Sequence, residues 1–267
     1  MLSVIIPCYN VEHYISECLA SVLLWKDAEI IVVDDASTDG TVEQINRMLS
    51  HADANVQLIQ LRQNAGPSHA RNVGISRSSG DWLFFVDSDD VVLGGTENYA
   101  AQLAQGLRTH DVIYPEMIVR HGRTSIGKRY YQDILNVSPE KILRDNPIQH
   151  LLVSNYIGAF AFVSRDAIGD MRFNENLRAY EDWDLWLRMM LNGARFKFEP
   201  TPMGVYRVGR EGSLSTVILR SSRNRVRSNL QILSLNYERV VGQPEAQQSI
   251  MRRMRQLAVE LMLHPEN

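Results

Sequence analysis

Short apolar runs alternate with amphipathic segments along the first third of the chain. Most of these runs consist of β-branched, leucine and aromatic residues with few polar positions, which is typical of strands covered on both faces by helices. The alternation therefore predicts βαβ units and an α/β fold with a mostly parallel central sheet. The predicted strands are Val4–Ile6, Ile30–Val33, Val56–Leu61 and Trp82–Val86.

Helical periodicity is clearest between the first two predicted strands. Apolar residues from Val11 to Leu23 recur at intervals of three and four, so they share one face of a helix. The proline after Gly66 is suited to the first turn of another helix. Later in the chain, the pattern predicts helices at Tyr99–Leu107 and Glu181–Leu191, a short helix opened by Ser138-Pro139-Glu140, and strands at Val112–Tyr114, Arg195–Phe198 and Gly204–Tyr206.

The composition is that of an ordinary folded protein. The 267 residues include 45% hydrophobic and 22% charged side chains, which does not fit a disordered or fibrous chain. A formal charge of −3 gives no overall attraction to nucleic acid, so we expect no nucleic-acid partner. Cys8 and Cys18 make no disulfide framework, and no apolar run is long enough to span a bilayer. These features favour a cytoplasmic protein with buried thiols.

Polar side chains gather where three of the predicted strands end. Tyr9 and Asn10 follow the first strand, Asp34 and Asp35 the second, and Asp87 to Asp90 the fourth. The carboxyl ends of the strands in an open α/β sheet form the ligand crevice. Such residues also cap helices, but capping explains poorly why several carboxylates stand at one rim, where they repel each other unless a cation is present.

Carboxylate oxygens suit a hard divalent cation, so the acidic rim predicts a Mn²⁺ or Mg²⁺ site. Such ions commonly take one or two protein carboxylates and complete their shell with phosphate oxygens and water, which implies a diphosphate ligand. The sequence contains neither a G-x-x-x-x-G-K-[ST] loop nor a G-x-G-x-x-G turn after the first strand. This argues against P-loop hydrolases and dinucleotide dehydrogenases.

Five motifs, in order along residues 2 to 215, resemble the signatures of family 2 glycosyltransferases. The predicted secondary structure around each motif agrees with this resemblance. It implies an A-type glycosyltransferase fold, built on a Rossmann-like nucleotide-binding domain, and inversion of the anomeric configuration of the transferred sugar. The motifs are Pro7-Cys8-Tyr9-Asn10, Val33–Asp39, Asn64–Gly74, Val86-Asp87-Ser88-Asp89-Asp90 and Tyr180–Asp184.

The resemblance also implies roles in binding a nucleotide-sugar donor. Asp35 would bind the base, most simply uracil, Asp87 would reach the ribose, and Asp89 would coordinate the cation that bridges the two phosphates. Arg71 would add positive charge near the donor, and a structural salt bridge is an equal alternative for it. The expected donor-binding residues are Pro7, Tyr9, Asp35, Arg71, Asp87 and Ser88, with Asp89 as the metal ligand.

An acceptor hydroxyl that attacks the anomeric carbon must lose a proton, so the reaction needs a general base. The resemblance points to Asp182 for this role, at the start of the predicted helix Glu181–Leu191. The alternative is that this acidic pair only favours the positive end of the helix. Trp183 is expected in the core, although its place beside the base also suits stacking on an acceptor ring.

The sequence departs from the family pattern after the base helix. Many members have Tyr-Arg-x-His there, with a histidine that helps to bind the metal. This chain has Tyr206-Arg207-Val208-Gly209-Arg210 and no histidine up to Ser215. Arg207 or Arg210 is therefore expected to meet the diphosphate directly.

Three other classes of protein use some of the same residue types. A phosphatase of the haloacid dehalogenase type also carries two aspartates after a strand, but after its first strand and not its fourth. A glycoside hydrolase pairs carboxylates without needing a metal or a diphosphate. A non-catalytic nucleotide-sugar-binding protein would be expected to lack Asp89 or Asp182, and both are present.

We expect one catalytic domain followed by a tail. The domain covers residues 1–215, with a nucleotide-binding half at 1–95 and an acceptor-binding half at 96–215. The expected acceptor is a glycan or glycolipid of cell-surface polysaccharide or lipopolysaccharide synthesis. Residues 216–267 are basic and amphipathic, which predicts a helical tail packed on the domain. A homodimer contact and peripheral contact with the inner face of the membrane are the alternatives for this tail.

Overall fold

Residues 1–50, 55–104, 109–121, 125–209 and 222–263 are described by the structure, a computed structural model. Their strands are β1 (Leu2–Cys8), β2 (Ala28–Asp34), β3 (Val56–Gln60), β4 (Trp82–Phe85), β5 (Val91–Val92), β6 (Val112–His121), β7 (Ser125–Arg129), β8 (Phe162–Ser164) and β9 (Phe196–Val208). Their helices are α1 (Ile15–Val22), α2 (Thr41–Leu49), α3 (Pro67–Arg77), α4 (Thr96–Ala104), the π-helical turn η1 (Tyr130–Leu135), α5 (Pro139–Asp145), α6 (Pro147–Val153), α7 (Arg165–Ile168), α8 (Glu181–Leu191), α10 (Ser222–Arg239) and α11 (Pro244–Leu263).

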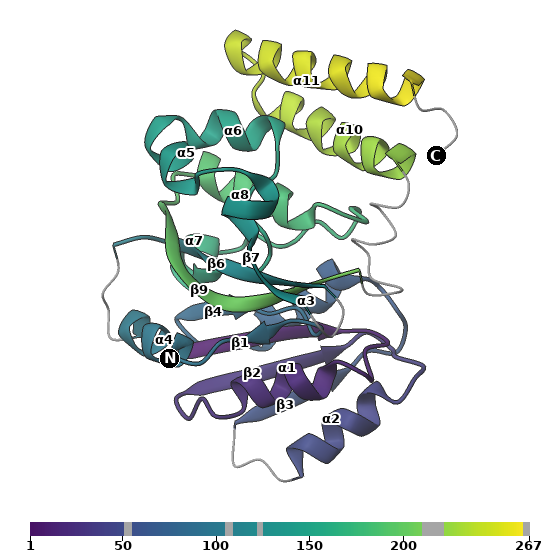
Figure 1. Cartoon of the computed structure of the whole chain (residues 1–267), viewed down its shortest axis with the longest axis vertical. Coiled ribbons are helices and arrows are strands. Elements are labelled where there is room, and N and C mark those ends of the chain that lie inside the picture. The colour runs from purple at the N-terminus through teal and green to yellow at the C-terminus, as the bar shows by residue number, and fades with distance from the viewer. Residues whose placement is uncertain (51–54, 105–108, 122–124, 210–221, 264–267) are drawn as a thin grey trace.

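One mixed sheet runs through the molecule (Figure 1). Its strand order is β3-β2-β1-β4-β8-β6-β9-β5, with β7 paired to β6. β1 pairs in parallel with β2 and β4, and β2 with β3, which confirms the βαβ arrangement predicted for the first third of the chain. Alternate residues of β1 pack on opposite layers. Val4 and Ile6 share a core with α1, whereas Ile5 lies against α3. Both faces of the strand are covered, which explains its apolar sequence.

The second half of the sheet is less regular than the sequence pattern predicts. β8 pairs antiparallel with β4 and β6, and no pattern marks its three residues as a strand. The separate strands expected at Arg195–Phe198 and Gly204–Tyr206 form the single strand β9, so the predicted break is wrong. The register between β6 and β9 shifts around Pro200 and Pro202. A bulge there absorbs the two prolines that make the sequence look like a turn.

The predicted helical tail is present as α10 and α11, which pack against each other and against α6 (Figure 1). Its apolar face belongs to the same hydrophobic cluster as Trp183 and Trp186 of α8, so the tail and the preceding domain share a core. Within the described part of the chain, none of the helices has the length and apolar character needed to cross a membrane. Cys8 and Cys18 are both buried and free, as expected.

The contact between α3 and β1 leaves no room for a side chain at Gly74. A methyl group added there would overlap the buried side chain of Ile5. We expect Gly74→Ala to lower the free energy of unfolding by about 1 kcal/mol, because overpacking costs about 1–3 kcal/mol and better helix propensity offsets about 1 kcal/mol. Gly94→Ala is the control, since nothing lies within 4 Å of a methyl group there. Urea unfolding measures both variants, and equal stability would contradict this packing.

Candidate active site

Two strands end side by side at one edge of the sheet, and the chain leaves a third strand nearby. Cys8 at the end of β1 pairs in register with Asp34 at the end of β2, and β4 ends beside the middle of β1. Pro7 is buried within β1. Tyr9, one residue beyond the strand, is 42% exposed. An exposed aromatic ring at this edge offers a surface on which a flat base can stack.

The two aspartates at the end of β2 are buried and hydrogen-bonded to the backbone. Asp35 accepts hydrogen bonds from the N–H groups of Ala65 and Gly66, at 2.8 and 2.7 Å. Asp34 accepts one from the N–H of Ser37. Asp35 therefore fastens the loop before α3 to the end of β2, and burial raises the pKa of its carboxyl group. Its oxygens each keep a second lone pair, so this role leaves capacity for a ligand N–H.

A buried arginine links the segment after β4 to the start of α8. The Arg71 guanidinium donates to Asp87 Oδ1 at 2.7 Å and to Glu181 Oε1 at 2.6 Å. The Arg71 side chain is 4% exposed, whereas those of Glu181 and Asp87 are 11% and 38% exposed. The guanidinium also lies 5.3 Å from the centre of the Phe173 ring. These contacts fit the salt-bridge alternative for Arg71, and they join residues 110 positions apart in the sequence.

Asp182 lies beside this ion-pair network, in the first turn of α8. Its Oδ1 accepts hydrogen bonds from the Trp183 N–H at 2.7 Å and from the Asn155 side chain at 3.3 Å. No described residue donates a hydrogen bond to Oδ2. Burial and the neighbouring carboxylate of Glu181 raise the pKa of Asp182 to about 7. A carboxyl group of this kind exchanges its proton near neutral pH, as a general base requires.

Arg207 of β9 supports the acidic segment after β4. Its backbone N–H donates to Asp90 Oδ1 at 2.9 Å, and its Nε donates to the Asp89 carbonyl at 2.8 Å. Its Nη2 pairs with Glu17 at 2.8 Å. These bonds hold the turn that carries Asp89 and give no support to the expected contact between Arg207 and a diphosphate. Arg210, the other arginine expected there, lies outside the described residues.

The carboxylates of this segment make the edge strongly negative. Asp87 and Asp89 are half-buried, whereas Asp90 is buried. Burial and the charges of Asp89 and Asp87 raise the pKa of Asp90 well above its ordinary value. Hard oxygen ligands in such a potential suit a divalent cation. No group of three or more His, Cys, Asp or Glu side chains in the described chain could hold a metal, so an ion here would need oxygens from its ligand.

The backbone is strained at three points around this edge. Asn10, Ala36 and Tyr180 have φ angles of 50°, 60° and 61°, in the left-handed region that non-glycine residues rarely adopt. They follow β1, follow β2 and precede α8. Among the described residues, Asn136 is the one other non-glycine residue with a positive φ. Strained residues cluster at functional sites, so these angles mark the edge independently of the sequence motifs.

Comparisons with known proteins agree with this geometry. The family model described as Glycosyl transferase family 2 matches residues 3–172, more than half of the chain. The chain belongs to glycosyltransferase family 2. An uncharacterized glycosyltransferase of Haemophilus influenzae is 34% identical over 195 residues, which cover 70% of each chain. The poly(ribitol-phosphate) β-N-acetylglucosaminyltransferase TarS of Staphylococcus aureus is 30% identical over 215 residues, which cover 79% of this chain but 36% of TarS.

Solved structures place this glycosyltransferase in the expected A-type fold. Residues 1–349 of TarS, crystallised with UDP-GlcNAc, align with a TM-score of 0.67 at 25% identity, over 88% of this chain and 66% of that one. The mannosyltransferase PcManGT of Pyrobaculum calidifontis, solved with GDP-Man and Mn²⁺, aligns with a TM-score of 0.62 at 19% identity, over 97% and 75%. The predicted fold and enzyme class are confirmed, and the phosphatase, hydrolase and non-catalytic alternatives are set aside.

Two residues outside the motifs join the site of this glycosyltransferase. Asn155 donates to Asp182, and no motif surrounds it. Tyr130 of η1 feels the charges of both Asp182 and Asp90, and burial together with these charges raises its pKa to about 12. No sequence signal marks Tyr130, because its position depends on a π-helical turn after β7.

The tryptophan after the candidate base belongs to the core. Trp183 is fully buried, and its indole N–H donates to the carbonyl of Leu151. The core interpretation is therefore confirmed, and the suggestion that its ring stacks on an acceptor is wrong. The apolar spacing along α8 requires this position to face inward, which outweighs its proximity to Asp182 in the sequence.

Proposed function

We propose that this glycosyltransferase moves a sugar from a UDP-sugar to an acceptor hydroxyl with inversion, with Asp182 as the base and Asp89 as the ligand of Mn²⁺ or Mg²⁺. The observation that carries the proposal is the ion-pair network of Arg71. One guanidinium holds Asp87, in the aspartate segment after β4, and Glu181, next to the candidate base. Donor-side and acceptor-side groups are thereby fixed relative to one another, as a direct displacement requires.

On the donor side, the proposed contacts follow the edge of the sheet. The exposed ring of Tyr9 and the remaining lone pairs of Asp35 support a base pocket. Both terminal nitrogens of Arg71 donate to carboxylates and its side chain is 4% exposed, so its proposed contribution to donor binding is mainly the positive charge that it places next to Asp87. The proposed donor-binding residues are Pro7, Tyr9, Asp35, Arg71, Asp87 and Ser88.

A divalent cation fits the acidic segment that follows β4. Asp89 would hold the cation, and diphosphate oxygens would complete the shell. When bound, the cation supplies positive charge that stabilises the departing nucleoside diphosphate. Asp89 is kept in position by the bond from Arg207 to its carbonyl oxygen.

On the acceptor side, Asp182 takes the proton of the attacking hydroxyl. The Trp183 N–H and Asn155 hold Oδ1, which leaves Oδ2 to accept the proton. Because burial and Glu181 raise the pKa to about 7, a substantial fraction of Asp182 is ionised at neutral pH and still binds a proton readily.

For the acceptor, we propose a hydroxyl group of a cell-surface glycan or glycolipid, bound by the half of the domain at residues 96–215. This proposal rests on the relatives, since TarS is a poly(ribitol-phosphate) β-N-acetylglucosaminyltransferase. A cytoplasmic site of action at the inner face of the membrane fits such an acceptor. Thermal stabilisation by UDP-glucose, UDP-galactose and UDP-N-acetylhexosamines, each with Mn²⁺, would identify the donor.

Asp89→Asn is expected to weaken the Mn²⁺-dependent binding of a UDP-sugar by at least about tenfold, because a neutral amide is a poorer ligand for a hard cation. Titration calorimetry with UDP-GlcNAc, with and without Mn²⁺, measures this loss. Asp27→Asn makes the same chemical change at an exposed position and serves as the control. Unchanged Mn²⁺-dependent affinity in Asp89→Asn would contradict the assignment of Asp89.

A further inference from the structure

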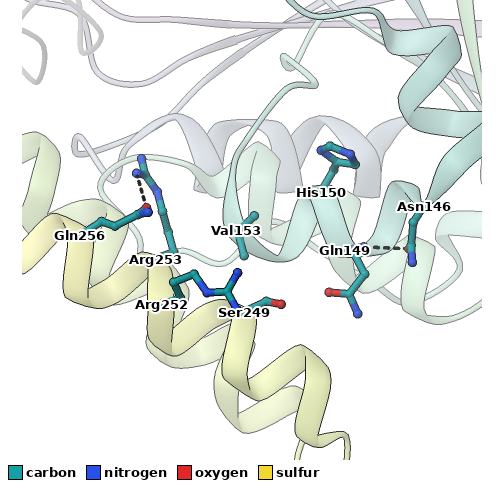
Figure 2. A pocket seen from close by; sticks show the side chains of 8 residues that line it. All are labelled: Asn146, Gln149, His150, Val153, Ser249, Arg252, Arg253 and Gln256. Atoms are coloured by element: carbon teal, nitrogen blue, oxygen red, sulfur yellow. Dashed lines mark hydrogen bonds between the residues drawn. The ribbon is translucent and has the colours of Figure 1, made fainter.

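A pocket lies between α6 and α11, apart from the sheet edge that carries the aspartates. Its volume of about 320 Å³ is near the lower end of the roughly 300–1,000 Å³ of ligand pockets. In Figure 2, side chains from α6 form one wall and side chains from α11 form the other. Most of the lining residues can donate hydrogen bonds: Asn146, Gln149, His150, Ser249, Arg252, Arg253 and Gln256.

The lining of this pocket carries positive charge without negative charge. Arg252 and Arg253 contribute two guanidinium groups, and none of the eight lining residues is Asp or Glu. Arg252 has no hydrogen bond or ion pair with a described residue, and Arg253 has one contact of 3.4 Å with the side-chain oxygen of Gln256. Within the described chain, the two charges therefore have no carboxylate to neutralise them.

Two other arginines of the tail helices are paired with acids. Arg225 pairs with Glu260, and Arg239 pairs with the buried Asp184 of α8. These two arginines are thus neutralised, whereas the described residues offer no acid partner to Arg252 and Arg253, nor to the exposed Arg223, Arg227 and Arg255. Arg252 and Arg253 differ from those three because they line one pocket together. A guanidinium fork fits the oxygens of a phosphate with two parallel hydrogen bonds.

The walls of the pocket are fixed by the hydrophobic core. Leu151 and Leu152, on the other side of α6, are fully buried, as is Ile250 on the other side of α11. The Asn236 side chain of α10 also donates to the Leu152 carbonyl, at 3.1 Å. The backbones that carry the donors are therefore held before a ligand arrives, which lowers the ordering cost of binding.

A short stretch of chain connects the pocket with the acceptor side of the proposed active site. Val153 lines it, and Asn155, two residues further along, donates to Asp182. Two residues of extended chain span at most about 7 Å. We propose that the pocket binds a phosphate ester group of the acceptor, at a distance from the hydroxyl that reacts. The assignment to the acceptor rests on the proposed function.

Titration of the full chain with glycerol 3-phosphate, without divalent metal, tests the pocket directly. Wild type is expected to bind it, and Arg252→Gln/Arg253→Gln to bind at least about tenfold more weakly, because charged hydrogen bonds are lost. Arg255→Gln removes an exposed charge from the same helix outside the pocket and should bind like wild type. Absence of binding in wild type, or an equal loss in Arg255→Gln, would overturn the inference.

A titration with UDP-GlcNAc and Mn²⁺ keeps the two proposals separate. Donor affinity should be the same in wild type and the double variant, because the pocket lies apart from the donor edge. If wild type binds the donor but not glycerol 3-phosphate, the inference about the pocket is overturned and the proposed function stands. If wild type does not bind the donor, the proposed function is overturned.

Binding to phosphatidylglycerol vesicles is a further test of what the two arginines recognise. If the double variant loses vesicle binding but keeps glycerol 3-phosphate binding, the arginines serve a lipid surface and the inference fails.

Discussion

Asp182→Asn is expected to slow sugar transfer by about 10²–10⁴-fold, the range that a positioned general base contributes. The amide keeps the shape of the side chain but cannot take a proton from the acceptor. Donor affinity should stay close to that of wild type, so steady-state kinetics and donor titration together separate chemistry from binding. Asp145→Asn makes the same change at an exposed position on α5 and should leave the rate unchanged. Transfer at the wild-type rate in Asp182→Asn would exclude this residue as the base.

The pH dependence follows from the same carboxyl group. Burial and Glu181 raise its pKa to about 7, so the free enzyme holds Asp182 largely protonated below pH 7 and ionised above it. kcat/KM should therefore rise with pH and level off above about pH 7. The pKa of Asp182 in the folded protein lies above the ordinary value of about 4, so the unfolded state loses this proton first as the pH rises. The free energy of unfolding is therefore expected to fall between about pH 4 and pH 7. Asp182→Asn should abolish both effects, and an unchanged acidic limb would assign it to another group.

Arg71→Met is expected to lower the free energy of unfolding by about 3–5 kcal/mol, the typical effect of removing one partner of a buried ion pair. Most of this loss comes from Glu181, whose side chain is 11% exposed and would keep an uncompensated charge. Asp87 contributes less, because its side chain is 38% exposed and water can solvate it. Denaturant unfolding measures the change, and transfer should fall with it because the two sides of the site lose their link.

A double variant separates charge from packing at this position. Glu181→Gln removes the unpaired charge, so Arg71→Met/Glu181→Gln should be more stable than the sum of the single effects predicts, by about 0.5–3 kcal/mol. Arg47→Met is the control, because its pair with Glu43 is 63% and 75% exposed and should contribute little. Additive effects at Arg71 and Glu181 would show that the two residues are not coupled.

The parallel half of the sheet could be predicted because its signal is local. An apolar run covered on both faces by helices fits few other structures, and the predicted strands Val4–Ile6 and Ile30–Val33 lie within β1 and β2. The other half depends on partners that are distant in sequence. β8 has three residues and is ordered by β4 and β6, while β9 stays paired with β6 through Pro200 and Pro202 because the extra residues of β9 form a bulge there.

The motifs could predict which acids gather at the site but not how they are held. Asp87 and Glu181 each stand in a motif, yet their connection through Arg71 appears only in three dimensions. The same applies to Tyr130, whose influence on the site depends on the conformation of a segment without a motif. Burial that results from tertiary packing sets the pKa of Asp182, and the sequence around a carboxylate does not specify such burial.

The ion pair between Arg239 and Asp184 connects α10 to α8, the helix that carries the proposed base. Asp184 lies two residues after the proposed base, fully buried, and accepts hydrogen bonds from Arg188 of its own helix and from Arg239 of α10. A relative with a different C-terminal region would keep Arg188 as the partner of one oxygen of this aspartate but would need another donor for the oxygen that Arg239 binds. A change at position 184 is therefore expected to accompany a change at position 239 among homologues, so the two positions should covary.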